Sequence, residues 1–321
     1  MRLLFVVHRY APFPGGSEIY VQAMAEASRD RGHNVAVFAG EHQGTYNGIP
    51  VSSDTGILLQ NWDLIIVHGG DVSVQNFVLT NAARIPSPIL YLLVLPSDSK
   101  ECLDGLQNCA LLGCSTPEDW EHCEKYGVIG KAVQVRHGIN WQDCMGATGF
   151  KQKHGIEGAM FVSCGGYYPN KAMQRLADIF AIAELPDTTL VTTGYDNSHN
   201  LMPQPAPNIM PLMIADRTEV LSAIYEADCL IMHSYREGFG LVLLEAQFNQ
   251  TPWIARKIAG AKVLAKHGLT YESDAELLVH LRNFSRYKYD ARSAYEYVTT
   301  NHLITHTVYD IEMALYALKH P

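Results

Sequence analysis

Short apolar runs alternate along the chain with segments whose apolar residues recur at helical spacing. Residues 3–7 are continuously apolar, as expected of a strand buried on both faces of a parallel sheet. Residues 17–31 follow with a helical pattern that stops at Gly32, and residues 34–38 are apolar again. Residues 1–40 therefore predict a β-α-β unit.

The alternation runs to residue 135, and a fresh cycle starts near residue 160. A glycine-rich stretch without clear periodicity, 141–158, separates the two cycles. Strands that alternate with helices predict an α/β protein of two doubly wound domains, which we place at 1–140 and 141–302. Further strands are predicted at 64–67, 89–93, 111–114, 132–135, 160–163, 189–192, 229–233 and 253–255. Helices are predicted at 171–185, 218–227, 240–248, 275–284, 291–299 and 303–318, with a loop that runs through Pro211.

Length and charge narrow the classes of function. A chain of 321 residues is long enough for two domains of ordinary size. The net charge is −9, and residues 1–140 hold 9 basic and 14 acidic residues, a difference of −5. This excess of negative charge argues against nucleic acid as a partner. Residues 1–140 also lack the basic amphipathic helix expected of an enzyme that works on anionic lipid.

Cysteine usage and the apolar runs indicate the compartment. The seven cysteines are an odd number and form no C-x-x-C pair, which favours reduced thiols over disulfides or a zinc site. No apolar run is long enough for a membrane span, and the start has no export signal. We expect a cytoplasmic protein without a transmembrane segment.

The segment REGFGLVLLEA, residues 236–246, contains two carboxylates eight positions apart. Glu237 stands before a Gly-Phe-Gly-Leu turn, at the expected carboxyl end of a strand, where ligands bind in open α/β sheets. Backbone amides of such a turn can approach a diphosphate. Glu245 lies in an apolar context and needs a partner, such as the hydroxyls of a ribose. Ordinary surface and helix-bridging carboxylates would give the same spacing.

The motif and its surroundings resemble the retaining glycosyltransferases of family 4. Glu237 and Glu245 match the family's E-x7-E motif, and NQTPWIA and YEADCLIMHS match the segments on either side of it. The N-terminal PFPGGSEIYVQAMAEASRDRGHNVAVF is similar to the family's glycine-rich loop, helix and following strand. The resemblance implies the GT-B fold, in which two Rossmann-like doubly wound domains face a central cleft. It also implies that the C-terminal helix, about 303–319, can pack back on the first domain.

The resemblance assigns roles to individual residues. It places Glu245 on the donor ribose, Glu237 on the donor sugar, and Lys171 of SCGGYYPNKAM on the diphosphate. His68, in DLIIVHGGD, would lie beside the transferred sugar and stabilise it. Catalytic residues are therefore His68, Glu237 and Lys171. The donor-binding set is Gly15, Gly16, Gly166, Lys171, Glu237, Gly238, Phe239, Gly240, Leu241 and Glu245.

Three positions depart from the family pattern. Gly166 stands where the family has an arginine against the diphosphate, and Ala172 and Gln250 replace two glycines. A missing cation weakens the neutralisation of the leaving nucleoside diphosphate. Either Lys171 alone neutralises it, or Arg256 or Lys257 takes the place of the missing arginine. Otherwise the activity is slow or lost.

The predicted function is that of a retaining, metal-independent hexosyltransferase or a related enzyme. The chain contains no Asp-x-Asp pair, so we expect no metal and no cofactor beyond a UDP- or GDP-linked sugar as co-substrate. The first domain would bind a glycan or small-molecule acceptor, and because it is small, an oligomer or partner subunit could complete it.

Two alternatives remain open. The first is a catalytically degenerate GT-B subunit that binds a nucleotide sugar or supports an active partner. The glycine at position 166, where the family has an arginine, suggests this alternative. The second is a nucleotide-sugar epimerase of similar two-domain fold, against which the E-x7-E segment argues.

Overall fold

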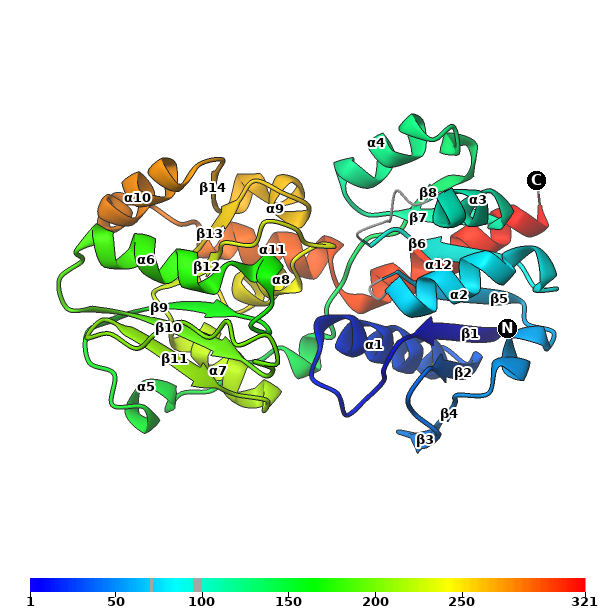
Figure 1. Ribbon diagram of the computed structural model, residues 1–321, viewed down its shortest axis with the longest axis horizontal. Helices are drawn as coiled ribbons and strands as arrows, with labels where there is room; N and C mark the ends of the chain where they lie inside the picture. The colour runs from blue at the N-terminus through cyan, green and yellow to red at the C-terminus, as the bar shows by residue number, and fades with distance from the viewer. Residues whose placement is uncertain (70–71, 95–99, 321) are drawn as a thin grey trace. The chain divides into compact units, whose positions relative to one another are not determined.

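The computed structural model describes residues 1–69, 72–94 and 100–320 and divides the chain into two compact α/β units (Figure 1). Unit 1 comprises Met1–Gly138 and Leu303–Pro321, and unit 2 comprises Ile139–His302. Within the described ranges no helix is both long and apolar enough to cross a bilayer. Short 3-10 helices are η1 Thr55–Leu59, η2 Ala82–Arg84, η3 Ile129–Lys131, η4 Trp141–Asp143, η5 Pro169–Lys171, η6 Ala265–His267 and η7 Phe284–Arg286.

Unit 1 is built on a sheet with the strand order β3-β4-β2-β1-β5-β6-β7-β8. The strands pair in parallel, except that β3 and β4 form an antiparallel hairpin. Helix α12, from the end of the chain, packs on α1 in this unit. The strands are β1 Arg2–Val7, β2 Asn34–Ala39, β3 Gly44–Tyr46, β4 Ile49–Ser52, β5 Leu64–His68, β6 Ile89–Leu92, β7 Leu111–Cys114 and β8 Ala132–Gln134. The helices are α1 Gly16–Asp30, α2 Val72–Asn81, α3 Lys100–Asn108, α4 Pro117–Lys125 and α12 Ile304–Lys319.

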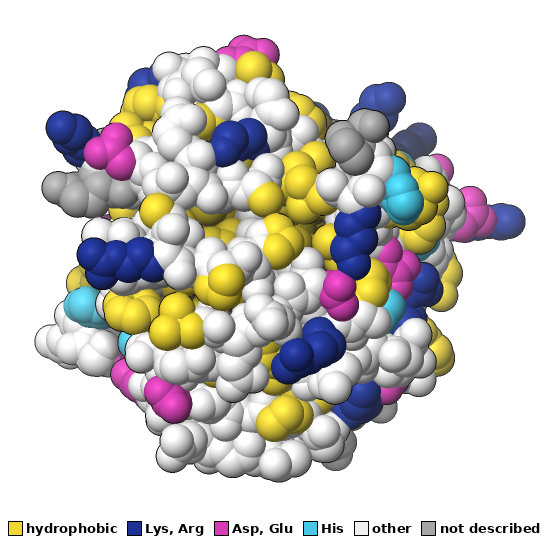
Figure 2. Space-filling model, turned by 90° about the vertical axis from the view of Figure 1, so that its right-hand side faces the viewer, with side chains coloured by type: hydrophobic (Ala, Val, Ile, Leu, Met, Phe, Trp, Pro, Cys, Tyr) yellow, Lys and Arg dark blue, Asp and Glu magenta, His cyan; other side chains and the backbone are white. Residues whose placement is uncertain are grey.

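The surface of unit 1 mixes charges of both signs with apolar side chains. On the face drawn in Figure 2, Lys and Arg side chains are separated from one another by acidic, apolar and uncharged ones. No large patch of one sign gathers on the part of this face that is coloured by side-chain type. This face therefore lacks the dense positive field by which a protein attracts a polyanion.

Unit 2 is built on a parallel sheet with the order β11-β10-β9-β12-β13-β14. The strands are β9 Ala159–Cys164, β10 Thr188–Gly194, β11 Ile209–Met213, β12 Cys229–Met232, β13 Trp253–Arg256 and β14 Leu269–Tyr271. The helices are α5 Phe150–Lys153, α6 Met173–Ala183, α7 Arg217–Glu226, α8 Leu241–Phe248, α9 Gly260–Val263, α10 Asp274–Arg282 and α11 Ala291–Asn301.

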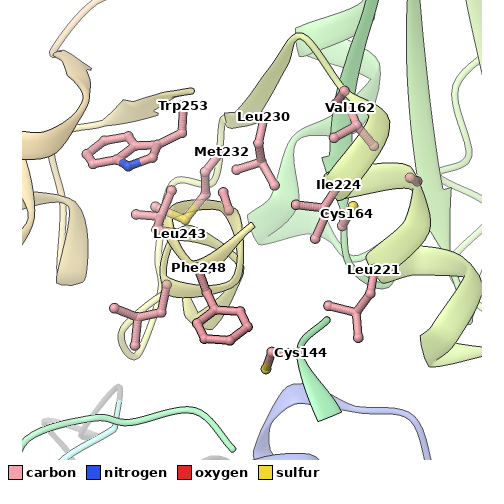
Figure 3. Packing of buried hydrophobic residues seen from close by; sticks show 14 of the residues in the cluster. Cys144, Val162, Cys164, Leu221, Ile224, Leu230, Met232, Leu243, Phe248 and Trp253 are labelled. Carbon is pink, nitrogen blue, oxygen red and sulfur yellow. The ribbon is translucent and has the colours of Figure 1, made fainter. Parts of the chain in front are cut away.

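Alternate residues of the strands of unit 2 enter two different cores. Met160 and Val162 face a core that contains α7, α8 and α11, whereas Phe161 faces a core that contains α6 and α10. Figure 3 shows part of the first core, where Leu243 of α8 lies beside Met232 of β12 and Trp253 of β13. Each such side chain contributes about 1.5–3 kcal/mol by leaving water. The two cores hold the strand ends in fixed positions.

The sequence prediction was wrong at β11. The sequence predicts a loop through Pro211, but residues 209–213 form a strand beside β10. The strand lies at the edge of the sheet, where a missing N–H removes no bond to a further strand. The pattern also missed β3, β4 and β14, three short strands.

Candidate functional site

The order of strands creates a switch point in the middle of each sheet. In unit 2 the chain proceeds outward from β9 to β11 and then crosses to β12, on the other side of β9. The connections after β9 and β12 therefore leave the sheet in opposite directions. Ligands of open α/β sheets bind in the crevice that this divergence leaves at the carboxyl ends of the two strands.

Lys171 and Glu237 come from the two connections at this switch point. Lys171 ends η5 in the connection after β9, and Glu237 lies in the connection after β12. The Lys171 Nζ donates to Glu237 Oε1 at 2.6 Å, and the Ser234 hydroxyl donates to the same oxygen at 2.6 Å. The side chains of Lys171 and Glu237 are 21% and 11% exposed, so the ion pair is partly shielded but reachable.

The amino end of α8 lies next to this ion pair along the chain. Gly240 precedes α8 with φ 94°, and a Cβ there would lie 2.7 Å from the Met232 sulfur, so only glycine fits. Gly240 offers no side chain to cap the helix, which leaves the first backbone N–H groups for a ligand or water. Phe239 is buried in the core, so its contribution to binding is restricted to the backbone.

Glu245 is buried about one turn into α8 and is paired with a residue that was not identified from the sequence. Arg217 Nη2, from the first residue of α7, donates to Glu245 Oε1 at 2.8 Å. The Glu245 side chain is 5% exposed. Burial lowers the pKa of Arg217, but the neighbouring Glu245 carboxylate outweighs this effect and the pKa is raised overall. Within the protein, the partner of Glu245 is thus a cation, where the sequence suggested ribose hydroxyls.

The missing arginine at position 166 has a structural correlate. A Cβ on Gly166 would lie 2.3 Å from a ring carbon of Tyr168, so Tyr168 occupies the space of a side chain at 166. The two nominated substitutes are both engaged. Arg256 Nη2 donates to Asp274 at 3.1 Å, and the exposed Lys257 is paired with Glu272 at 2.9 Å.

The other two departures from the family pattern retain the backbone shape that glycine favours. Ala172, which precedes α6, has φ 50°, and Gln250, which follows α8, has φ 60°. Both are left-handed conformations that cost a residue with a Cβ about 1 kcal/mol. The chain therefore keeps the turns without the residue that forms them most readily.

The sequence candidates of unit 1 gather at the switch point of its own sheet. The chain proceeds from β1 to β2 on one side and continues with β5 on the other side of β1. Gly15 and Gly16 start α1 in the connection after β1, and His68 ends β5. His68 is 5% exposed, and burial lowers its pKa to about 4, so its ring is neutral near pH 7. Gly70 and Asp71, the end of the motif DLIIVHGGD, lie outside the described residues.

In the part of the chain that the structure describes, no three His, Cys, Asp or Glu residues are grouped so that they could hold a metal ion.

Comparison with known proteins finds a family similar to part of the chain. Residues 149–279 match the family model described as "Glycosyl transferases group 1". The matched segment contains Lys171, Glu237 and Glu245, and it lies within unit 2. A search of curated protein sequences finds no match.

Solved structures with two-domain folds superpose on almost the whole chain. HepE of Anabaena, in complex with UDP and glucose, has a TM-score of 0.80 and 16% identity and covers 99% of this chain and 100% of its own. Sucrose-phosphate synthase of Thermosynechococcus elongatus has a TM-score of 0.78 and 14% identity, covering 100% and 99%. WaaG, a glycosyltransferase of lipopolysaccharide biosynthesis, has a TM-score of 0.70 and 17% identity, covering 97% and 98%.

The chain has the GT-B fold, and residues 149–279 in unit 2 are similar to glycosyl transferases group 1. The fold predicted from the sequence is thereby confirmed. Three residues that contact the candidate positions of unit 2 were not identified from the sequence: Ser234 at Glu237, Arg217 at Glu245 and Tyr168 at Gly166. No spacing signalled Arg217, because it comes from another helix. The two successive tyrosines at 167 and 168, next to a glycine where the family has an arginine, could have indicated Tyr168 from the sequence.

Proposed function

We propose that the chain is a retaining, metal-independent glycosyltransferase of family 4 that transfers a sugar from a UDP- or GDP-linked donor to a hydroxyl group. The acceptor is a glycan or a small molecule. The observation that carries the proposal is the meeting of Lys171 and Glu237 at the switch point of unit 2, beside an uncapped helix. The match of residues 149–279 to glycosyl transferases group 1, and neighbours whose structures hold UDP or UDP-glucose, support the donor class.

The two charged groups divide the donor between them. Lys171 is the cation for the diphosphate, and the first amides of α8 add backbone donors. When the phosphate takes the lysine, Glu237 is released to accept hydrogen bonds from sugar hydroxyls. Stabilisation of the negative charge that develops on the leaving diphosphate is usually the largest contribution to catalysis, and preorganised hydrogen-bond donors provide it best. Glu245, held by Arg217, reaches the ribose.

The chemistry proceeds on one face of the sugar. The bond from the anomeric carbon to the phosphate oxygen breaks and the bond to the acceptor oxygen forms on the same side. The acceptor's hydroxyl proton passes to the leaving phosphate, so no side chain acts as base. His68 is neutral near pH 7 because burial lowers its pKa to about 4, which suits a group that orients the sugar by hydrogen bonding.

The remaining assignments follow from the same resemblance. Unit 2 binds the donor and unit 1 selects the acceptor, and no cofactor is required. The seven cysteines are all buried as free thiols, in keeping with a cytoplasmic location.

Product stereochemistry tests the reaction class. The purified chain is incubated with UDP-glucose and with GDP-mannose, with and without EDTA, and proton NMR follows the anomeric signals. A product with the donor's configuration, formed at an unchanged rate in EDTA, is expected. Inversion, or a rate that EDTA abolishes, would refute the retaining or the metal-independent part separately.

The second candidate is a GT-B subunit that binds a nucleotide sugar without turning it over. It is favoured by Gly166 and Tyr168, which leave the diphosphate one cation short. Calorimetric binding of UDP or GDP without turnover of any sugar-linked form would decide for it.

A further inference from the structure

The connection after β9 contains two successive tyrosines with different surroundings. Tyr167 is fully buried, and its hydroxyl donates to the Leu212 carbonyl at 2.9 Å, below the ends of β10 and β11. Tyr168 is only partly buried. Tyr167 therefore anchors the connection, and Tyr168 is turned to the surface at the carboxyl end of the sheet.

The ring of Tyr168 is held in one place. Its hydroxyl donates to Asp196 Oδ2 at 2.9 Å, and the Tyr195 hydroxyl lies 3.3 Å from the Tyr168 hydroxyl oxygen. The Tyr167 N–H donates to the Asp196 carbonyl at 2.8 Å, which ties the connections after β9 and β10 together. The rings of Tyr195 and His199 lie edge-on to Tyr168, with centroids at 6.1 and 5.8 Å. A fixed aromatic group thus stands between the ends of β9 and β10.

This aromatic group excludes a charge from position 166. Any side chain at 166 would overlap the Tyr168 ring, because a Cβ there lies 2.3 Å from ring carbon Cε2. The Tyr168 N–H also donates to the Gly166 carbonyl at 2.8 Å, so the two residues form one tight turn. A cation at 166 and a ring at 168 are therefore alternatives at this site.

We propose that Tyr168 is a donor-binding residue that contacts the nucleoside of the donor through its aromatic ring, in place of a charge on the diphosphate. The inference rests on the proposed function. Lys171, three residues further along the chain, comes from the same connection as Tyr168. A nucleoside has a flat face that stacks on aromatic rings, and such a contact tolerates different bases because every base has a π-face. Binding of the donor should then depend on the nucleoside more than on the phosphates.

Variants at 166 and 168 test the proposal by calorimetry with UDP, GDP and inorganic pyrophosphate as probes. Tyr168→Leu keeps bulk and removes the ring, and we expect the Kd for the preferred nucleotide to rise about tenfold. The Kd for pyrophosphate should not change. Tyr168→Phe, the matched control, loses the bond to Asp196 but keeps the ring and should bind within about twofold of the parent, since no hydroxyl contact to the ligand is invoked.

The exchange of ring for charge is tested by Gly166→Arg with and without Tyr168→Ala. Alone, Gly166→Arg must displace the ring and should weaken nucleotide binding. Combined with Tyr168→Ala, it should restore binding of nucleotide and of pyrophosphate, now with a steeper dependence on salt. Thermal melts of all variants exclude loss of fold as the cause.

The outcomes separate this inference from the proposed function. If Tyr168→Leu binds as the parent does, or loses nucleotide and pyrophosphate in equal proportion, the aromatic contact is refuted while the transferase assignment stands. If the parent chain binds neither UDP nor GDP, both fall.

Discussion

Replacing Glu237 with glutamine should tighten the binding of a free nucleoside diphosphate while it impairs transfer. In the structure Lys171 is bound to Glu237 at 2.6 Å, so an incoming phosphate has to compete with the carboxylate for the same ammonium. Glu237→Gln keeps the size and the bond from Ser234 but removes the charge. The phosphate would then meet an uncommitted lysine and no repelling carboxylate.

The size of the effect follows from the geometry of the ion pair. A hydrogen bond between charged groups contributes about 1.5–3 kcal/mol, and both side chains are less than one-quarter exposed, at 21% and 11%. Because glutamine retains part of the bond, we expect a gain of about 1–1.5 kcal/mol, or five- to tenfold in the Kd of UDP or GDP. Transfer should fall at least about a hundredfold, because the proposed role of Glu237 is to hold the sugar in the reaction.

Isothermal titration at low salt measures the binding half of this prediction, and release of nucleoside diphosphate measures the transfer half. Glu296→Gln is the control, because Glu296 sits in an exposed ion pair with Arg292 on α11 and should leave both quantities unchanged. Weaker or equal nucleotide binding by Glu237→Gln would show that the carboxylate does not compete with phosphate. The reasoning on this ion pair would then be wrong.

Three further predictions concern stability. Arg217→Met strands the buried Glu245 and should lower the free energy of unfolding in urea by about 3 kcal/mol, whereas the exposed Arg292→Met should not lower it. His68 has a folded pKa of about 4, below its unfolded value near 6.5, so it contributes stability above pH 6.5 that is lost as the pH falls towards 4. Between pH 7.5 and 5.5 the parent should therefore lose about 1.3 kcal/mol more than His68→Asn, and equal slopes in urea titrations would refute this. Gln250→Gly relieves a left-handed backbone at φ 60° and should raise the unfolding free energy by about 0.5–1 kcal/mol, whereas an unchanged or lower melting temperature would contradict the cost assigned to that turn.

The sequence predicted most of the central strands because their residues are apolar on both faces. Residues 3–7 and 229–233 needed no knowledge of their neighbours to be recognised. Short edge strands such as β11 were missed, since Pro211 interrupts its apolar run and only the edge of a sheet accepts a proline readily. Their pairing is decided by the strand beside them, which a local pattern does not show.

The candidate site divides in the same way. Glu237 and Lys171 could be nominated from motif and location, and the structure brings them to 2.6 Å. Arg217 could not be nominated from the sequence, because its contact with Glu245 joins two different helices. The first residues of α7 and α8 are 24 positions apart, and β12 lies between the two helices in the chain. The sequence also could not explain why position 166 is a glycine, because the Tyr168 ring lies against this position only in the folded chain.

The most direct test of the account is the rate at which Lys171→Met releases nucleoside diphosphate from a sugar donor, compared with Lys153→Met. Both lysines form ion pairs of 2.6 Å, Lys171 with Glu237 at the switch point and the exposed Lys153 with Glu219 away from it. Loss of a cation that stabilises the leaving group should slow Lys171→Met by about a hundredfold or more. Lys153→Met should keep the parent rate. A Lys171→Met variant as fast as the parent would contradict the placement of the donor at this site.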